Sequence, residues 1–150
     1  MIALASDHAG VELKSAIAKY LEDAGLPYTD FGTHSEASCH YPEYALKAAN
    51  AVASGGYEKG ILICGTGVGI GIAAGKVKGI RCAICSEPLS ARLSREHNDT
   101  NILSLGARII GEDMALEIVR EWLATPFSNG ERHLIRVAQI AQIEQNGKLD

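Results

Sequence analysis

The feature that most constrains the fold is a short apolar run that leads directly into a glycine-rich stretch. Residues 60–64 are Gly-Ile-Leu-Ile-Cys, and residues 65–71 are Gly-Thr-Gly-Val-Gly-Ile-Gly. A continuous apolar run bounded by glycine is typical of a strand buried on both faces, as in a parallel sheet. Glycines after such a strand allow a tight turn into a helix. The pattern therefore predicts a strand, a glycine loop and a helix over residues 72–76.

The rest of the chain alternates strands and helices in the same way. Apolar positions four apart, at Leu13, Ile17 and Leu21, predict an amphipathic helix after the first strand. The predicted strands are 2–6, 28–31, 60–64, 80–86 and 102–105, and the other predicted helices lie near 44–54, 87–96, 113–124 and 132–145. Strands alternating with helices predict an α/β fold: one domain over 1–150, with a five-stranded parallel, Rossmann-like sheet in a three-layer αβα arrangement.

The last predicted helix has no further strand to return to. Its apolar residues include Leu134, Val137, Ala138 and Ala141. We therefore expect this stripe to pack on a partner subunit.

Composition and charge exclude several classes of protein. The chain has 14 Lys and Arg against 18 Asp and Glu, a net charge of −4, which argues against a nucleic-acid or membrane-surface binder. No apolar run approaches the roughly 20 residues of a membrane span, and the apolar start meets Asp7 too early for a signal peptide. We expect a cytoplasmic protein whose four cysteines are free thiols.

In doubly wound sheets, ligands bind beyond the carboxyl ends of the strands, where the winding reverses. The polar turns predicted there are Asp7-His8, residues 64–71 and Ser86-Glu87. His97, at the start of a polar patch, is expected in a loop near the same edge as His8.

The glycine loop suits an anion site, and more specific motifs as well as plain packing compete to explain it. Converging backbone N–H groups at a helix start favour an anion site. A Walker A loop is excluded because Ile70 and Val77 occupy positions that need Gly and Ser or Thr. A dinucleotide fingerprint fits residues 69–74 with Glu87 as the acidic partner, although the loop follows the third strand rather than the first. Glycines that serve packing alone remain a further alternative.

The cysteines and arginines give further candidates. Cys64 ends the central strand, where a thiol is either a small buried hydrophobe or a base or nucleophile activated by a helix N-terminus. Cys82 and Cys85 lie three apart in a predicted strand, so they face opposite sides and suit core packing. Arg132 and Arg136 share a helix face without acidic partners four residues away, which suits a phosphate clamp or a solvated face. Cys39-His40 alone is too little for a metal site, and no metal is expected.

Six segments together resemble the B-type ribose-5-phosphate isomerases and the related galactose-6-phosphate isomerase subunits. The segments are 6–10, 30–33, Tyr41-Pro42, 63–70, 94–99, and 130–133 with Arg136. The resemblance implies an aldose–ketose isomerase without metal or organic cofactor. It also implies a homodimer or a dimer of dimers with its sites at the subunit interface.

The resemblance also implies a role for each matching residue. Cys64 would be the base that moves a proton between C1 and C2 through an enediolate, and Thr66 and His97 would open the furanose ring. The loop Gly65, Gly67, Val68 and Gly69 would offer backbone N–H groups to the enediolate oxygen. Asp7 would hold sugar hydroxyls, and Tyr41 would border the sugar. The phosphate would be held by His8, Arg108, Arg132 and Arg136. The neighbouring subunit would supply His97, Asn98 and Arg108.

Two positions depart from the family pattern. His40 precedes Tyr-Pro where the family usually has Asp, and Gly75 precedes lysine where Asn is usual. His40 borders the sugar, so it bears on which sugar is bound. The expected activity is interconversion of D-ribose 5-phosphate and D-ribulose 5-phosphate in the pentose phosphate pathway. The alternatives are isomerisation of galactose 6-phosphate, allose 6-phosphate or a tetrose phosphate, and a nucleotide-binding module.

Overall fold

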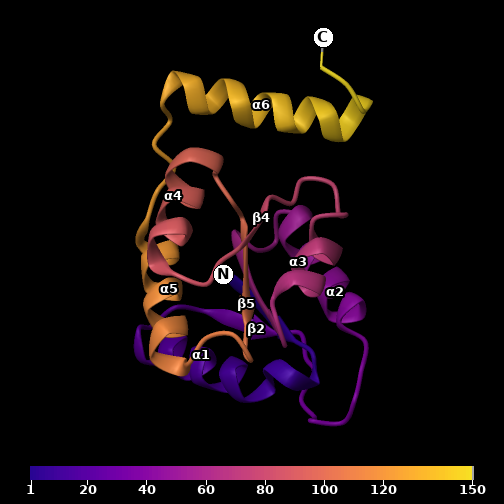
Figure 1. Cartoon of the computed structure of the whole chain (residues 1–150), viewed down its shortest axis with the longest axis vertical. Helices are drawn as coiled ribbons and strands as arrows, with labels where there is room; N and C mark the ends of the chain where they lie inside the picture. Colours follow the sequence, from indigo (N-terminus) through magenta and orange to yellow (C-terminus); the bar gives the residue numbers. More distant parts are fainter. Residues whose placement is uncertain (150) are drawn as a thin grey trace.

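The computed structural model describes residues 1–149, which form one parallel sheet between two layers of helices (Figure 1). None of the helices in this range is long and apolar enough to cross a membrane. In chain order the elements are β1 (Ile2–Ser6), the short 3-10 helix η1 (His8–Gly10), α1 (Val11–Asp23), β2 (Tyr28–Asp30), α2 (Tyr41–Ala53), β3 (Lys59–Cys64), α3 (Val68–Ala74), β4 (Cys82–Ile84), α4 (Pro88–Asn98), β5 (Ile102–Gly106), α5 (Glu112–Ala124) and α6 (Glu131–Asn146). The predicted αβα, Rossmann-like fold is confirmed.

The strand order is β2-β1-β3-β5-β4, and all neighbours are parallel. The chain winds from β1 outward to β2 and then crosses to β3 on the other side of β1, so the winding reverses between β1 and β3. Ser6 pairs with Ile63, and Cys64 pairs with Gly106. The residues that follow these strands therefore meet at one carboxyl edge, at the position where such sheets bind ligands.

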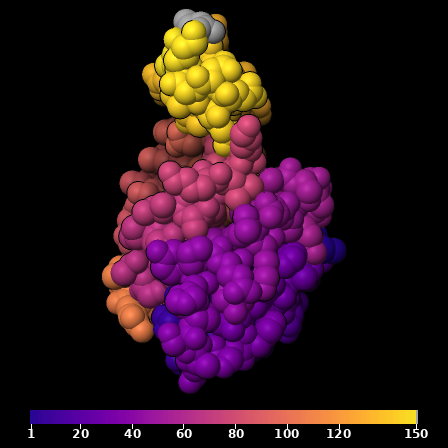
Figure 2. Space-filling model, turned by 90° about the vertical axis from the view of Figure 1, so that its right-hand side faces the viewer, coloured from indigo at the N-terminus to yellow at the C-terminus, as the bar shows by residue number. Residues whose placement is uncertain are grey.

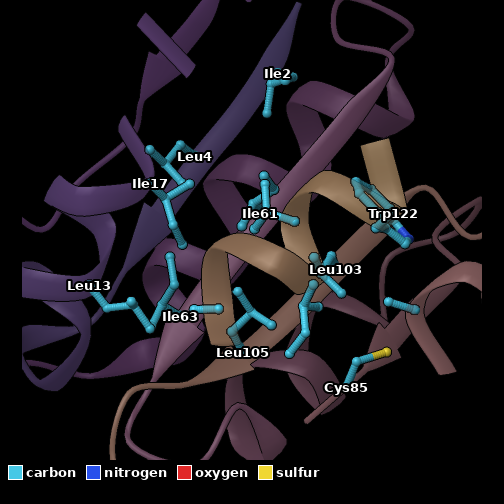
Figure 3. Packing of buried hydrophobic residues seen from close by; sticks show 14 of the residues in the cluster. Ile2, Leu4, Leu13, Ile17, Ile61, Ile63, Cys85, Leu103, Leu105 and Trp122 are labelled. Carbon is cyan, nitrogen blue, oxygen red and sulfur yellow. The ribbon is translucent and has the colours of Figure 1, made fainter. Parts of the chain in front are cut away.

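Alternate residues of the central strands enter two separate cores. In β1, Ile2 and Leu4 face α1, α4 and α5, whereas Ala3 and Ala5 face α2 and α3. Figure 3 shows the first core, in which Trp122 of α5 packs beside Ile61 and Leu103. Since both faces of the sheet are covered, the strands are continuous apolar runs rather than alternating ones.

Helix α6 lies apart from the two helical layers, across one end of the molecule (Figures 1 and 2). It is connected through Ser128, whose N–H and hydroxyl both donate to the Glu96 carbonyl, and through Glu144, which accepts the Gly79 N–H at 2.9 Å. Gly79 precedes β4, so α6 lies over the amino ends of the strands. Four large apolar side chains of α6 are about half exposed: Leu134, Ile135, Ile140 and Ile143.

Several boundaries differ from those predicted. Helix α3 begins at Val68 instead of residue 72, because Gly67 takes a left-handed conformation (φ 77°) that turns the chain immediately. Helix α2 already begins at Tyr41, with Pro42 in its first turn, where proline is well tolerated. Strand β4 is shorter than the predicted 80–86. Helix α4 continues through His97 and Asn98 and ends at Asp99, whose φ is 46°.

Cys82 and Cys85 belong to different cores, as their spacing predicts. Cys82 packs with the α2–α3 side and Cys85 with the α1–α5 side. Burial raises the pKa of Cys82 to about 12, with a smaller effect of Cys85. Burial, and then the Glu87 carboxylate, raise the pKa of Cys85 to about 11. Neither thiol ionises near neutral pH, so both act as packing residues.

The first prediction concerns Gly10, where η1 meets α1 directly above β3. A Cβ at this position would lie 2.8 Å from Ile63 Cγ2 and 2.9 Å from the Ile63 carbonyl oxygen. Gly10→Ala should therefore lower the free energy of unfolding by about 1–3 kcal/mol, measured by urea denaturation. Gly75→Ala is the control, because Gly75 is helical (φ −65°) and a Cβ there makes ordinary contacts at 3.5 Å. Equal effects of the two changes would contradict the close approach.

The second prediction concerns the reactivity of Cys82 and Cys85, whose pKa values are raised. In the folded protein at pH 7.5, the half-buried Cys82 and the buried Cys85 should be alkylated by iodoacetamide more slowly than Cys39, which is also half-buried. The rates are followed by peptide mass spectrometry. The rates for Cys82 and Cys85 should rise about tenfold per pH unit up to pH 10, because the thiolate is the reactive form. Rapid labelling of either thiol at neutral pH in folded protein would disprove the assignment.

Candidate functional site

Two adjacent strands bring Asp7 and Cys64 to the point where the winding reverses. Asp7 follows β1, and its N–H donates to the Ile63 carbonyl at 3.1 Å, which extends the pairing of β1 with β3. Its carboxylate accepts the Ala9 N–H at 3.0 Å and thereby caps η1. The side chains of Asp7 and Cys64 are 6% and 4% exposed. They form the floor of the site, where little water competes for a bound ligand.

The sulfur of Cys64 faces the backbone of the glycine loop. The Gly67 N–H points at Cys64 Sγ with an N–S distance of 3.1 Å. A donor aimed at sulfur complements negative charge that develops there during proton transfer. Cys64 also packs in the core with residues of α2 and α3, so the contact is compatible with a base as well as with a core residue.

The conformation of Gly67 depends on its close approach to β5. A Cβ on Gly67 would lie 2.7 Å from the Leu105 carbonyl carbon and 3.0 Å from the Gly106 nitrogen. The Gly67 carbonyl accepts the hydroxyl of buried Ser104 at 2.6 Å. Glycine is thus required here by its φ and by the lack of space, and the N–H that faces Cys64 is fixed in direction.

The rim of the site is formed by the remaining loop residues and two side chains beside them. The exposed Thr66 accepts the Val68 N–H on its hydroxyl oxygen at 3.2 Å. The Tyr41 ring lies against Gly69, where a Cβ would be 2.5 Å from Tyr41 Cζ. Because Val68, Gly69 and Ile70 open α3, their N–H groups have no partner within the helix.

Arg108 lies beside Gly65 of its own chain. The Arg108 N–H donates to the Gly65 carbonyl at 2.9 Å, and its Nη1 is 3.4 Å from the position of a Cβ on Gly65. The expectation that Arg108 reaches this site from a neighbouring subunit is therefore wrong. The reason is the β3–β5 pairing, which carries the segment after β5 back past the glycine loop.

His8 is oriented by a loop that the sequence did not connect with it. The Cys39 N–H donates to His8 Nδ1 at 3.3 Å, which leaves the ring proton on Nε2 as a donor for a ligand. The start of this loop is held by buried Lys14, which forms an ion pair with Asp30 at 2.7 Å and donates to the Thr33 carbonyl. Cys39 and Lys14 thus support the site, and neither was a sequence candidate.

His97 and Asn98 lie at the opposite edge of the sheet, so their predicted loop position near His8 is wrong. Helix α4 starts after the carboxyl end of β4 and runs back to the amino end of β5. The Asn98 carbonyl accepts from Arg81, which immediately precedes β4. The six-residue strand β3 alone places about 17 Å between the two edges. One copy of the chain therefore cannot bring His97 to its own Cys64.

Arg132 and Arg136 lie at the same amino edge of the sheet as His97. Both are exposed on α6, and within residues 1–149 neither forms an ion pair. The His97 and His133 rings stack between α4 and α6, with ring centroids 4.4 Å apart. The predicted residues thus form two groups: Asp7, His8, Tyr41, Cys64–Gly69 and Arg108 at the carboxyl edge, and His97, Asn98, Arg132 and Arg136 at the amino edge.

Two cavities differ in their relation to these groups. One of about 350 Å³ borders the glycine loop and is lined by Thr66, Val68, Gly106 and the half-exposed Ile84 and Ile109. Another of about 460 Å³ lies near Met1 and Pro27 and shares no residue with either group. Of these two, the first adjoins the candidate chemistry, and a further cavity of about 400 Å³ includes Asn98 of the amino-edge group. Within residues 1–149, no three His, Cys, Asp or Glu side chains are grouped as metal ligands.

The positions of Gly71 and Glu87 argue against a dinucleotide-binding fingerprint. A Cβ on Gly71 would lie 2.7 Å from Ile84 Cγ1, so this glycine permits α3 to pack on β4. The Glu87 carboxylate accepts the Ser90 N–H at 2.8 Å and caps α4, so it is engaged within the fold. Glycines of the supposed fingerprint thus serve packing, and its acidic partner has a structural role.

Comparisons with known proteins agree with the fold and identify the family. The family model for the Ribose/Galactose Isomerase family matches residues 2–140. Ribose-5-phosphate isomerase B of Escherichia coli is 51% identical over 144 residues, with 96% of each chain covered. The solved ribose-5-phosphate isomerase B of Clostridium thermocellum superimposes with a TM-score of 0.95 at 52% identity and covers 98% of this chain and 99% of its own. A ribose 5-phosphate isomerase of Thermotoga maritima gives a TM-score of 0.91 at 48% identity, covering 94% and 97%. The chain belongs to the ribose/galactose isomerase family.

Proposed function

We propose that this protein is a ribose-5-phosphate isomerase, which interconverts D-ribose 5-phosphate and D-ribulose 5-phosphate. The observation that carries the proposal is Cys64 Sγ, which lies 3.1 Å from the Gly67 N–H on the floor of the carboxyl-edge site. Relatives about half identical over nearly the whole chain bear the name of this activity. The reaction belongs to the pentose phosphate pathway.

The chemistry begins with the cyclic aldose. His97 and Thr66 assist transfer of the proton between the ring oxygen and the C1 hydroxyl, which opens the furanose to the aldehyde. Asp7 accepts hydrogen bonds from sugar hydroxyls, and Tyr41 at the rim limits the space beside Gly69. The aldehyde then lies with C1 and C2 above Cys64.

Proton transfer between the two carbons follows. The Cys64 thiolate removes the proton from C2. The C–H electron pair forms the C1–C2 double bond, and the carbonyl electron pair moves onto the C1 oxygen to give an enediolate. Backbone N–H groups of the loop 65–69 stabilise the charge on its oxygen; loss of one such donor typically costs about 3 kcal/mol of transition-state stabilisation. The same sulfur returns the proton to C1 while the C2 hydroxyl proton passes to the oxygen on C1, which leaves the carbonyl at C2 and yields the ketose. No atom is gained or lost, and the reaction needs no cofactor.

The phosphate requires the second group of residues. His8 and Arg108 lie at the carboxyl edge, and Arg132 and Arg136 lie about 17 Å away at the amino edge of the same chain. We infer that a second copy supplies Arg132, Arg136, His97 and Asn98, so that the active assembly is a homodimer or a dimer of dimers. The half-exposed apolar stripe of α6 fits this role, because it lacks a cover in its own chain over residues 1–149.

The free cysteines and His40 bear on the protein's compartment and on its range of sugar phosphates. All four cysteines are free, which suits the reducing cytoplasm. His40 lies at the start of α2 next to Tyr41, so it borders the sugar end that distinguishes pentose, hexose and tetrose phosphates.

The third prediction tests the activity and its base. The wild-type protein should convert ribose 5-phosphate to the ketose without added metal. Its kcat/KM should exceed those for galactose 6-phosphate, allose 6-phosphate and erythrose 4-phosphate. Cys64→Ala should lower kcat by about 10²–10⁴-fold, because general-base catalysis is lost, and should retain substrate binding by calorimetry.

Cys82→Ala is the matched control, since it removes a thiol that stays protonated in the core, and its kcat should stay within about twofold of wild type. Normal turnover by Cys64→Ala would show that Cys64 is not the catalytic base. Tight binding of NAD or ATP without binding of ribose 5-phosphate would favour a nucleotide-binding module instead.

The fourth prediction tests the shared site. Cys64→Ala and Arg132→Ala should each be inactive alone. When the two are co-expressed, about half of the dimers are hybrids, and each hybrid regains one intact site of its two. Activity should therefore recover to about a quarter of the wild-type value per chain. A mixture as inactive as its components would show that Cys64 and Arg132 do not act across a subunit boundary.

A further inference from the structure

His133 is a buried histidine that the proposed chemistry does not use. It lies in the first turn of α6, where its N–H donates to the Gly130 carbonyl at 2.9 Å. Its exposed fraction is 8%, whereas Arg132 before it and Leu134 after it are exposed. Among the described residues of α6, His133 is the one that is buried. A polar side chain buried at the base of an otherwise exposed helix calls for a specific partner.

That partner is His97. The two rings are 4.4 Å apart between centroids and inclined by 8°, which is a parallel stack. Arg132 Nε donates to His133 Nε2 at 3.4 Å, so Nε2 carries the lone pair and His133 is neutral. Burial, and then the charges of His97, Arg132 and Arg136, lower the pKa of His133. The lowered pKa favours the neutral form of the His133 ring in the stack.

Other links between α6 and the rest of the chain lie close to this stack or far from it. Ser128 donates to the Glu96 carbonyl, and the Gly79 N–H donates to Glu144 near the other end of the helix. Glu96 is the residue before His97, so the link and the stack act at one point. A ring held on one face by a parallel neighbour has few rotamers available. The stack therefore fixes the plane of the His97 imidazole.

We propose that His133 is a positioning residue, whose flat ring packs on His97 and holds it in the orientation needed to open the sugar ring. This inference rests on the proposed function. It assigns His133 to ring opening and not to the proton transfer at Cys64, which takes place at the other edge of a different copy of the chain. Because ring opening and proton transfer respond differently to deuterium at C2, the role of His133 can be measured.

The experiment compares His133→Ala with His133→Phe in the full-length protein, using ribose 5-phosphate and its C2-deuterated form. His133→Ala removes the packed ring, so kcat/KM should fall by about tenfold or more. The primary deuterium isotope effect on kcat/KM should not rise above the wild-type value, because a slower ring opening masks the C–H step. His133→Phe keeps a flat ring of similar size and should retain kcat/KM within about threefold of wild type. Circular dichroism and thermal melting establish that each variant is folded.

The outcomes separate this inference from the proposed function. If wild type does not isomerise ribose 5-phosphate, the proposed function fails. If wild type is active and His133→Ala keeps normal kcat/KM, the positioning role fails. An isotope effect that rises in His133→Ala would show damage to the proton-transfer step and would also overturn it. If His133→Phe is as impaired as His133→Ala, a flat ring at this position is not sufficient to orient His97, and the inference is rejected. It is rejected likewise if neither variant folds, because His133 is then required for folding.

Discussion

The arrangement at the carboxyl edge depends on the approach of Gly67 to β5. Gly67 has a left-handed φ, and a Cβ on it would lie only 2.7 Å from the Leu105 carbonyl carbon, so there is no room for a side chain. Its carbonyl accepts the Ser104 hydroxyl. These constraints turn the Gly67 N–H toward Cys64 and start α3 immediately afterwards. A loop fixed in this way holds its donors before the substrate arrives, so little reorganisation is needed when charge develops. For the proposed base, Cys64, such preorganised donors would stabilise the charge that proton transfer creates.

Much of the fold follows from local patterns in the sequence, because buried parallel strands and amphipathic helices leave periodic signals. The apolar run at 60–64 predicts β3, and the i, i+4 stripe from Leu13 predicts α1. The start of α3 was misplaced because periodicity does not report the sign of φ at Gly67. The end of α4 was misplaced because the polar residues 97–99 are typical of a loop, although Asp99 terminates the helix.

The candidate site was predicted in part. Asp7 and the glycine loop follow from strand order, since carboxyl ends of parallel strands meet. The His8–Cys39 contact and the Lys14–Asp30 ion pair depend on how the loop 31–40 returns to the sheet, which no short-range pattern encodes. His133 was missed because a single histidine on a helix is usually structural, and its significance comes from a stack with another element. Arg108 was placed in the wrong copy because its motif does not specify the register of β5 beside β3.

The two outer strands have a consequence for how copies of this chain meet. β2 and β4 each contain three residues, so the sheet offers short borders with few free backbone groups. Continuous sheets across two molecules, and the fibrous aggregates that grow by the same route, need longer borders than these. In the proposed dimer, the subunits would therefore meet through side chains packed on helices rather than through backbone pairing between strands.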